Sequence, residues 1–144
     1  MVRAWWIAAL IGWSACLSAF AEGEEQPVLS GEWLIVEVDS VPVEAFHSEN
    51  VAYIGFDDRD HRVWGCSGCN RLLGTYTTDA STGQLDLSGM GSTKMLCADM
   101  QLEDAVMRAL ARVARYEVLE DGCIGLYDED GTRAMVLKKR KDKR

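Results

Sequence analysis

Short segments of alternating apolar and polar residues, separated by tight turn signals, most constrain what this chain can fold into. Alternation with a period of two is typical of half-buried β-strands. Asp57 to Asp60, residues 79–83 and the Asp121-Gly122 pair are turn signals of this kind. We predict seven or eight strands, drawn from residues 33–38, 51–56, 61–64, 73–78, 84–87, 116–119, 123–127 and 133–137. Many short strands with tight turns favour an antiparallel barrel-like or strongly curled sheet.

One segment has the period of an amphipathic helix, from about residue 100 to residue 115. Asp99 is the expected N-cap, and Glu103 and Asp104 place negative charge in the first turn, where the helix dipole favours it. The apolar positions follow the spacing of one buried stripe: Leu102, Val106, Ala109, Leu110 and Val113. The predicted fold class is therefore mainly β (α+β), with a single helix packed on the sheet and covering an open side of it.

The N-terminal residues predict an exported protein. Arg3 is positively charged, an apolar stretch follows over residues 4–15, and Ala19-Phe20-Ala21 is a small-x-small cleavage site. The stretch is shorter than the roughly 20 apolar residues of a membrane span. We expect a signal peptide over residues 1–21, a flexible lead-in over residues 22–28, and a periplasmic location.

A second processing site lies five residues earlier. Small residues usually precede a lipidated bacterial cysteine, and Ser14 and Ala15 precede Cys16 in this way. Trp13, however, stands where an aliphatic residue is usual. Lipidation at Cys16 would make the protein a membrane-anchored lipoprotein. An uncleaved anchor is a third alternative.

The charge distribution argues against nucleic acid as a partner. Residues 22–137 sum to a net charge of −14, so they offer no basic surface to neutralise phosphates. The chain then ends in a basic tail, residues 139–144, and Lys138 to Arg144 hold six basic residues and one acid. This tail could make weak contact with anionic lipid or lipopolysaccharide, but we favour a solvated terminus.

Four cysteines follow the predicted signal peptide: Cys66, Cys69, Cys97 and Cys123. An even set in an oxidising compartment predicts two disulfides, with three connectivities open. A redox pair at Cys66 and Cys69 is less favoured, because no helix starts there to lower a thiol pKa. A zinc site would need a second close-spaced pair, and free thiols are the remaining alternative.

Several segments together resemble a known family. They are Leu29-Ser30-Gly31-Glu32-Trp33, Gly65-Cys66-Ser67-Gly68-Cys69-Asn70-Arg71, Gly74-Thr75-Tyr76 and Thr93-Lys94-Met95-Leu96-Cys97. In this order they resemble the META/HslJ family of small bacterial envelope proteins (a DUF306-type META domain), with Leu96 replacing the usual Ala. The resemblance covers residues 29–138.

The resemblance implies an antiparallel β-barrel-like fold with a packed helix. It also implies that Cys69 and Cys97, which occupy the motif positions, form one disulfide, which leaves Cys66 and Cys123 for a second. The remaining motif residues are expected to be structural signature positions: Gly31, Trp33, Gly65, Gly68, Asn70, Gly74, Tyr76, Thr93 and Met95.

Two groups of residues allow more than one interpretation. Asn70 could contact a ligand, but we favour a turn residue that tolerates a left-handed backbone and caps its own turn. Trp33, Tyr53, Trp64 and Tyr76 are interpreted as core or barrel-mouth packing, with an apolar groove for a lipid or peptide as the alternative.

The sequence contains no recognised catalytic constellation. Neither His47 nor His61 has a nucleophile or a metal partner at a recognisable spacing, and no nucleophile elbow or phosphate loop is present. We expect no catalytic residues, no metal and no cofactor. The expected function is a non-catalytic envelope domain that binds a protein or lipid partner, and the resemblance implies a role in stress tolerance, through heat-induced expression and novobiocin resistance. An acyl-chain carrier and a thiol-active protein using Cys66 and Cys69 are the alternatives.

Overall fold

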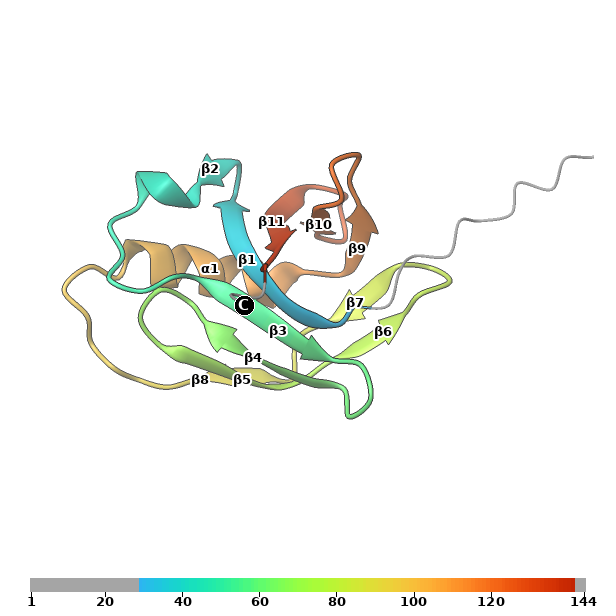
Figure 1. Ribbon diagram of the computed structural model, residues 1–144, viewed down its shortest axis with the longest axis horizontal. Helices are drawn as coiled ribbons and strands as arrows, with labels where there is room; N and C mark the ends of the chain where they lie inside the picture. Colours follow the sequence, from blue (N-terminus) through green and yellow to red (C-terminus); the bar gives the residue numbers. More distant parts are fainter. Residues whose placement is uncertain (1–28, 142–144) are drawn as a thin grey trace, which may run out of the picture.

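The computed structural model describes residues 29–141, which form eleven strands, one α-helix and one 3-10 helix (Figure 1). The strands are β1 (Gly31–Val38), β2 (Val41–Pro42), β3 (Tyr53–Asp57), β4 (Arg62–Cys66), β5 (Arg71–Thr75), β6 (Thr77–Asp79), β7 (Gln84–Asp86), β8 (Met90–Ser92), β9 (Arg115–Val118), β10 (Ile124–Tyr127) and β11 (Arg133–Lys139). The 3-10 helix spans Val43–Ala45, and α1 spans Gln101–Arg112. The expected signal peptide, the lipidation site at Cys16, the lead-in and the last three tail residues lie outside the described part of the chain.

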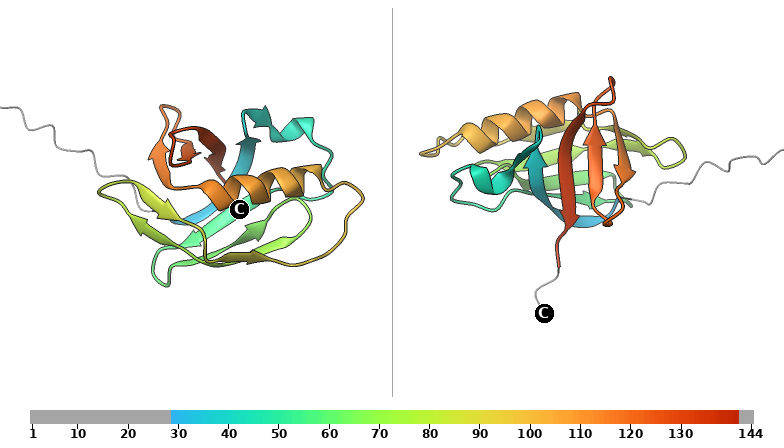
Figure 2. Two further views of the ribbon diagram at one scale, coloured as in Figure 1. Left: turned by 180° about the vertical axis from the view of Figure 1, so that it is seen from behind. Right: turned by 90° about the horizontal axis from the view of Figure 1, so that it is seen from above.

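All strands belong to one antiparallel sheet, in the order β6-β7-β9-β10-β11-β1-β3-β4-β5-β8, with β2 paired to β1. β5 and β6 stand far apart in this order, yet Tyr76 alone connects them. The chain therefore bends sharply at Tyr76, and the sheet curls into a half-barrel (Figures 1 and 2). Tyr76 is 3% exposed, and its backbone N–H donates to the carbonyl of His61 at 3.0 Å. The mainly β fold predicted from the sequence is confirmed.

The core lies between the curled sheet and α1, which crosses the open side of the sheet (Figure 2). The helix contributes the predicted apolar stripe, with Val106 and Ala109 completely buried. Inward-facing strand residues such as Ile54, Leu126 and Leu137 belong to the same core cluster and are 0% exposed. The hydrophobic effect of closing this interior is what holds the helix on the sheet.

The structure has eleven strands rather than seven or eight, and α1 ends at Arg112 rather than near residue 115. β2 and β8 were not predicted, because two or three residues carry no measurable alternation. The predicted strand over residues 73–78 is divided into β5 and β6 at Tyr76. The N-cap of α1 is Met100 rather than Asp99, whose Oδ1 accepts a hydrogen bond from the Gln101 N–H at 2.9 Å. Within residues 29–141, no helix is long and apolar enough to cross a membrane.

Candidate functional site

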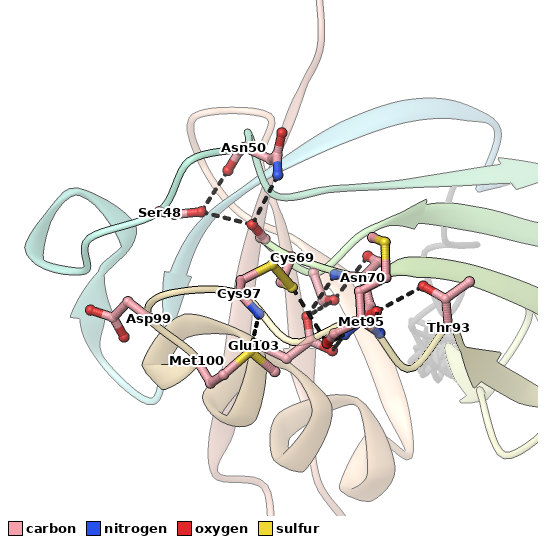
Figure 3. Close-up of a disulfide and its surroundings, with 12 residues drawn as sticks. Ser48, Asn50, Cys69, Asn70, Thr93, Met95, Cys97, Asp99, Met100 and Glu103 are labelled. Carbon is pink, nitrogen blue, oxygen red and sulfur yellow. Dashed lines mark hydrogen bonds between the residues drawn. A yellow bond between two sulfur atoms is a disulfide. The ribbon is translucent and has the colours of Figure 1, made fainter.

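The β4–β5 hairpin turn carries the most specific sequence motif. Cys66 and Arg71 form the last pair of the ladder, and the Ser67 N–H donates to the Asn70 carbonyl at 3.0 Å to close the turn. Gly68 has a φ of +106°, and a Cβ on it would lie 2.9 Å from a methyl carbon of Leu102. The positive φ favours glycine here, and the Leu102 methyl leaves little room for a side chain. The Gly68 carbonyl accepts a hydrogen bond from the Ser48 hydroxyl at 3.1 Å, which ties the loop before β3 to the turn (Figure 3).

Asn70 joins the turn to the segment that leads into α1 (Figure 3). Its Oδ1 accepts hydrogen bonds from the Thr93 hydroxyl at 2.8 Å and the Met95 N–H at 2.6 Å. Its Nδ2 donates to the Met95 carbonyl at 3.2 Å and to Glu103 Oε1 at 3.3 Å. Asn70 is 3% exposed and is not among the positive-φ residues. The expectation of a left-handed turn residue was therefore wrong: Gly68 makes the left-handed turn, and the amide of Asn70 cross-links segments distant in sequence.

Glu103 is a buried carboxylate in the first turn of α1, where the sequence places it, but its burial was not predicted. It is 5% exposed, and it accepts hydrogen bonds from the Ser67 hydroxyl and from the Asn70 backbone N–H at 3.1 Å. A signal for this burial existed, because Glu103 precedes Val106 by three residues and Leu110 by seven. That spacing places it on the buried stripe. No buried side-chain nitrogen or oxygen of the described residues lacks a hydrogen-bond partner.

A disulfide between Cys69 and Cys97 covers this polar cluster, with the two Cα atoms 6.0 Å apart (Figure 3). This is the pair that the resemblance implied. It closes a loop of sequence separation 28, so it holds the hairpin turn against the chain that enters α1. The β4–β5 turn, the segment that leads into α1 and the helix itself are thus joined by this disulfide and by the hydrogen bonds of Ser67, Asn70 and Glu103. We call this place the junction.

The second expected disulfide does not form: Cys66 and Cys123 are free thiols. Cys66 ends β4 and Cys123 precedes β10, and β11, β1 and β3 lie between these strands in the sheet. Four strand spacings amount to about 19 Å along the sheet, whereas a disulfide needs Cα atoms within about 7 Å. Burial and the neighbouring Asp121 carboxylate raise the pKa of the Cys123 thiol above its ordinary value.

The other signature residues are not at this junction. Trp33 lies on β1, where its indole donates to the Ser30 carbonyl at 3.1 Å and Lys139 lies over its ring at 4.6 Å. Gly31 opens that strand, and Tyr76 forms the corner between β5 and β6. Gly65 and Gly74 lie inside β4 and β5, where added Cβ atoms would come within 2.1 and 2.2 Å of neighbouring carbonyl oxygens. The motif therefore describes a fold, and only part of it converges on one place.

A shallow hollow of about 690 Å³ lies beside the junction on the outside of the sheet. We call this side of β1, β3, β4 and β5 the outer face; its outward side chains are Leu34, Tyr53, Trp64, Cys66, Arg71 and Leu73. Trp64 lies flat over Gly55, since a Cβ there would be 2.3 Å from the indole ring. Leu73 is 56% exposed, and Val51 and Met95 at the rim are 61% and 54% exposed. Trp64 and Tyr53 thus border a groove, which agrees better with the alternative interpretation of these residues than with core packing.

A larger hollow, about 950 Å³, lies among β6, β7 and the turn before β11 and is rich in carboxylates. These carboxylates close their own turns: Asp79 accepts from Ser81, and Asp128 accepts from the Asp130 and Thr132 N–H groups. The hydrogen bonds from Ser81 hold the pKa of Asp79 below its ordinary value. Among the described residues, no group of three His, Cys, Asp or Glu side chains is placed to hold a metal ion.

The geometry agrees with the comparisons to known proteins. A family model for the META domain matches residues 26–141. A protein from Burkholderia xenovorans, solved by NMR, is similar at 20% identity with a TM-score of 0.61, over 78% of this chain and 83% of the other. A second NMR structure has 23% identity and a TM-score of 0.57, over 77% and 90% of the two chains. A crystal structure of a DUF4847 family protein from Bacteroides vulgatus has 15% identity and a TM-score of 0.54, over 80% and 96%.

At these identities the solved structures establish a shared fold and nothing about activity. No curated protein matches the sequence significantly. The family model, in contrast, covers most of the chain and includes the turn, the disulfide and the helix described above. The chain therefore belongs to the META domain family.

Proposed function

We propose that this protein is an exported, non-catalytic envelope domain that acts by binding a partner through the outer face. The observation that carries the proposal is the gathering of exposed apolar side chains around one hollow. The side chains of Val51, Leu73 and Met95 are each more than half exposed there. The hollow lies beside the disulfide and the buried polar cluster formed by the family-motif residues. Contiguous exposed apolar surface is uncommon on soluble proteins, and where it occurs it often marks an interaction site.

Export is supported by two features. The sequence of residues 1–21 has the charge, apolar stretch and small-x-small site of a signal peptide. The disulfide between Cys69 and Cys97 fits an oxidising compartment, because such bonds are rare where thiols are kept reduced.

The hydrogen bonds of the buried polar groups support a binding role over a catalytic one. Ser67, Asn70 and Glu103 bond to one another and to backbone groups, and none of the three lines either of the two hollows described above. His47 is exposed in a loop, and the His61 ring packs edge-on against Tyr76 at 5.5 Å. A general base would need a substrate within hydrogen-bond reach.

The two alternative functions are less well supported. An acyl-chain carrier needs an empty interior, but the space between sheet and helix is filled by side chains that are 0–4% exposed, including Ile54, Val106 and Leu126. A redox pair needs Cys66 and Cys69 to alternate between thiols and a disulfide, but Cys69 is bonded to Cys97.

In vivo photo-crosslinking tests the proposal. A photoreactive amino acid at Leu73 should give an adduct in envelope fractions, whereas the same residue at Val118, an exposed apolar position on β9, should not. Growth at raised temperature or with novobiocin should be restored in a deletion strain by the unmodified protein and not by Leu73→Asp. An equal adduct yield at both positions, or full rescue by Leu73→Asp, would contradict the proposal.

A further inference from the structure

We infer that the partner of the outer face is an anionic lipid bilayer, on which the face and the basic end of β11 dock together. This inference rests on the proposed function, since it names the partner of the same surface. It follows from the register of the sheet, the charges on the face, the placement of aromatic rings and the position of the chain ends.

The register aligns cations and apolar side chains in two rows. In one row Lys138 lies opposite Leu34, and the row continues through neighbouring strands to Tyr53, Cys66 and Arg71. In the second row the Arg140 N–H donates to the Glu32 carbonyl at 3.0 Å, and Glu32 is followed by Gly55, Trp64 and Leu73. Because neighbouring partners in a sheet point to the same side, these side chains form one surface.

The charge on this surface is opposite to that of the rest of the protein. Lys138, Arg140 and Arg71 carry three positive charges, against one negative charge on Glu32, which is itself paired with Arg140 at 3.0 Å. Residues 22–137 as a whole carry −14. An anionic bilayer therefore repels most of the molecule and attracts this surface, so electrostatics selects both the lipid and the orientation.

Aromatic rings lie beside the cations on this surface. Arg140 lies 4.9 Å from the centre of the Tyr53 ring. The Trp64 indole N–H donates to Glu32 at 3.3 Å, which leaves its ring on the outside. Tryptophan and tyrosine prefer the headgroup level of a bilayer, where a ring is half in apolar surroundings and its polar end remains hydrated.

The two ends of the described chain leave the sheet at the edge of this surface. Trp33 on β1 pairs with Lys139 on β11, and the Lys139 ammonium donates to the Ser30 carbonyl. The start of β1 and the end of β11 thus lie side by side. Lipidation at Cys16 would attach an acyl anchor 13 residues before Leu29.

Vesicle binding of the purified, host-processed protein tests the inference. We expect co-sedimentation with vesicles that contain phosphatidylglycerol and none with phosphatidylcholine alone, weakening as salt rises. Each charge at a bilayer surface is worth about 1 kcal/mol, so Lys138→Gln should weaken binding roughly fivefold, and adding Arg71→Gln should weaken it roughly 25-fold. The matched control is Arg108→Gln, which removes one exposed positive charge from α1 and should leave binding unchanged.

A Trp33→Phe variant reports which surface docks. Trp64 is then the one remaining tryptophan within residues 29–141, and its emission should shift to the blue with anionic vesicles. An unshifted emission, equal binding to both vesicle types, or an equal effect of Lys138→Gln and Arg108→Gln would overturn the inference.

The outcomes separate this inference from the proposed function. If the protein ignores vesicles while the crosslinker at Leu73 captures a protein, including a second copy of this chain, the binding function stands and the lipid assignment is wrong. If the protein neither binds vesicles nor gives a crosslinked adduct at Leu73, the lipid inference and the proposed binding function are both wrong.

Discussion

Replacing Glu103 with alanine should destabilise the protein more than any other single change to an acidic residue on α1. The carboxylate is 5% exposed and accepts hydrogen bonds from the Ser67 hydroxyl, the Asn70 backbone N–H and the Asn70 side-chain amide. Its removal therefore affects three buried donors, two of which have a second acceptor within reach.

The expected loss in the free energy of unfolding depends on whether each donor has another acceptor within reach. The Ser67 hydroxyl can turn to the Asn70 carbonyl at 3.1 Å, and the Asn70 amide keeps the Met95 carbonyl at 3.2 Å. The Asn70 backbone N–H has no such second bond. A buried donor left unpaired costs about 1–3 kcal/mol, and the lost charge-assisted bonds add to this. We expect a loss of about 2–4 kcal/mol, a large part of a typical free energy of unfolding of about 5–15 kcal/mol.

Urea unfolding, followed by circular dichroism, measures this loss. Asp104→Ala is the matched control, because Asp104 is exposed in the same helical turn and should cost less than about 1 kcal/mol through the helix dipole alone. Glu103→Gln keeps the shape and one acceptor oxygen, so it should fall between the two. If Glu103→Ala and Asp104→Ala differ by less than about 0.5 kcal/mol with unchanged m-values, the junction does not stabilise the fold as we argue.

Three further outcomes follow from the structure. Cys97→Ser opens the loop closed by the disulfide, of sequence separation 28, and should lower the free energy of unfolding by about 3–4 kcal/mol in the chain-entropy model; a loss under 1 kcal/mol would contradict this. Iodoacetamide should alkylate Cys66 well before Cys123, since Cys123 is 8% exposed and burial raises its thiol pKa; peptide mass spectrometry giving the reverse order would refute the burial argument. Burial also raises the pKa of Tyr76, so its contribution to stability is fully present below about pH 10 and is lost as the pH rises through the folded-state pKa. Unfolding midpoints measured from neutral pH upward should fall above that pH, and Tyr76→Phe should make the fall shallower.

Much of the local structure could be predicted because it depends on neighbours in the sequence. Strand alternation, the Asp-Gly turn and the helical stripe are set by a few adjacent residues, and these elements occur where expected. The cysteine pair at Cys69 and Cys97 followed only from the family resemblance, since the residues alone left three connectivities open.

Contacts between distant segments could not be predicted, and they account for the differences at the candidate site. The local sequence places Glu103 in the first turn of the helix but does not encode its burial, which arises because the β4–β5 turn presents two donors of Asn70 to it. Cys66 and Cys123 were expected to form a disulfide, but three strands of the sheet lie between β4, which ends at Cys66, and β10, which follows Cys123. The predicted strand over residues 73–78 is cut at Tyr76 because its two halves pair with different partners.

The sequence by itself determined that the chain forms a β-rich domain with one amphipathic helix, since alternation and turn chemistry act over a few residues. Only the tertiary structure decided which polar groups are buried together, which cysteines form a disulfide, and that charged, aromatic and apolar side chains from β1, β3, β4, β5 and β11 share one surface. The physical reason is that strand order and register bring together residues as far apart in sequence as Glu32 and Arg140, and no local pattern encodes that pairing.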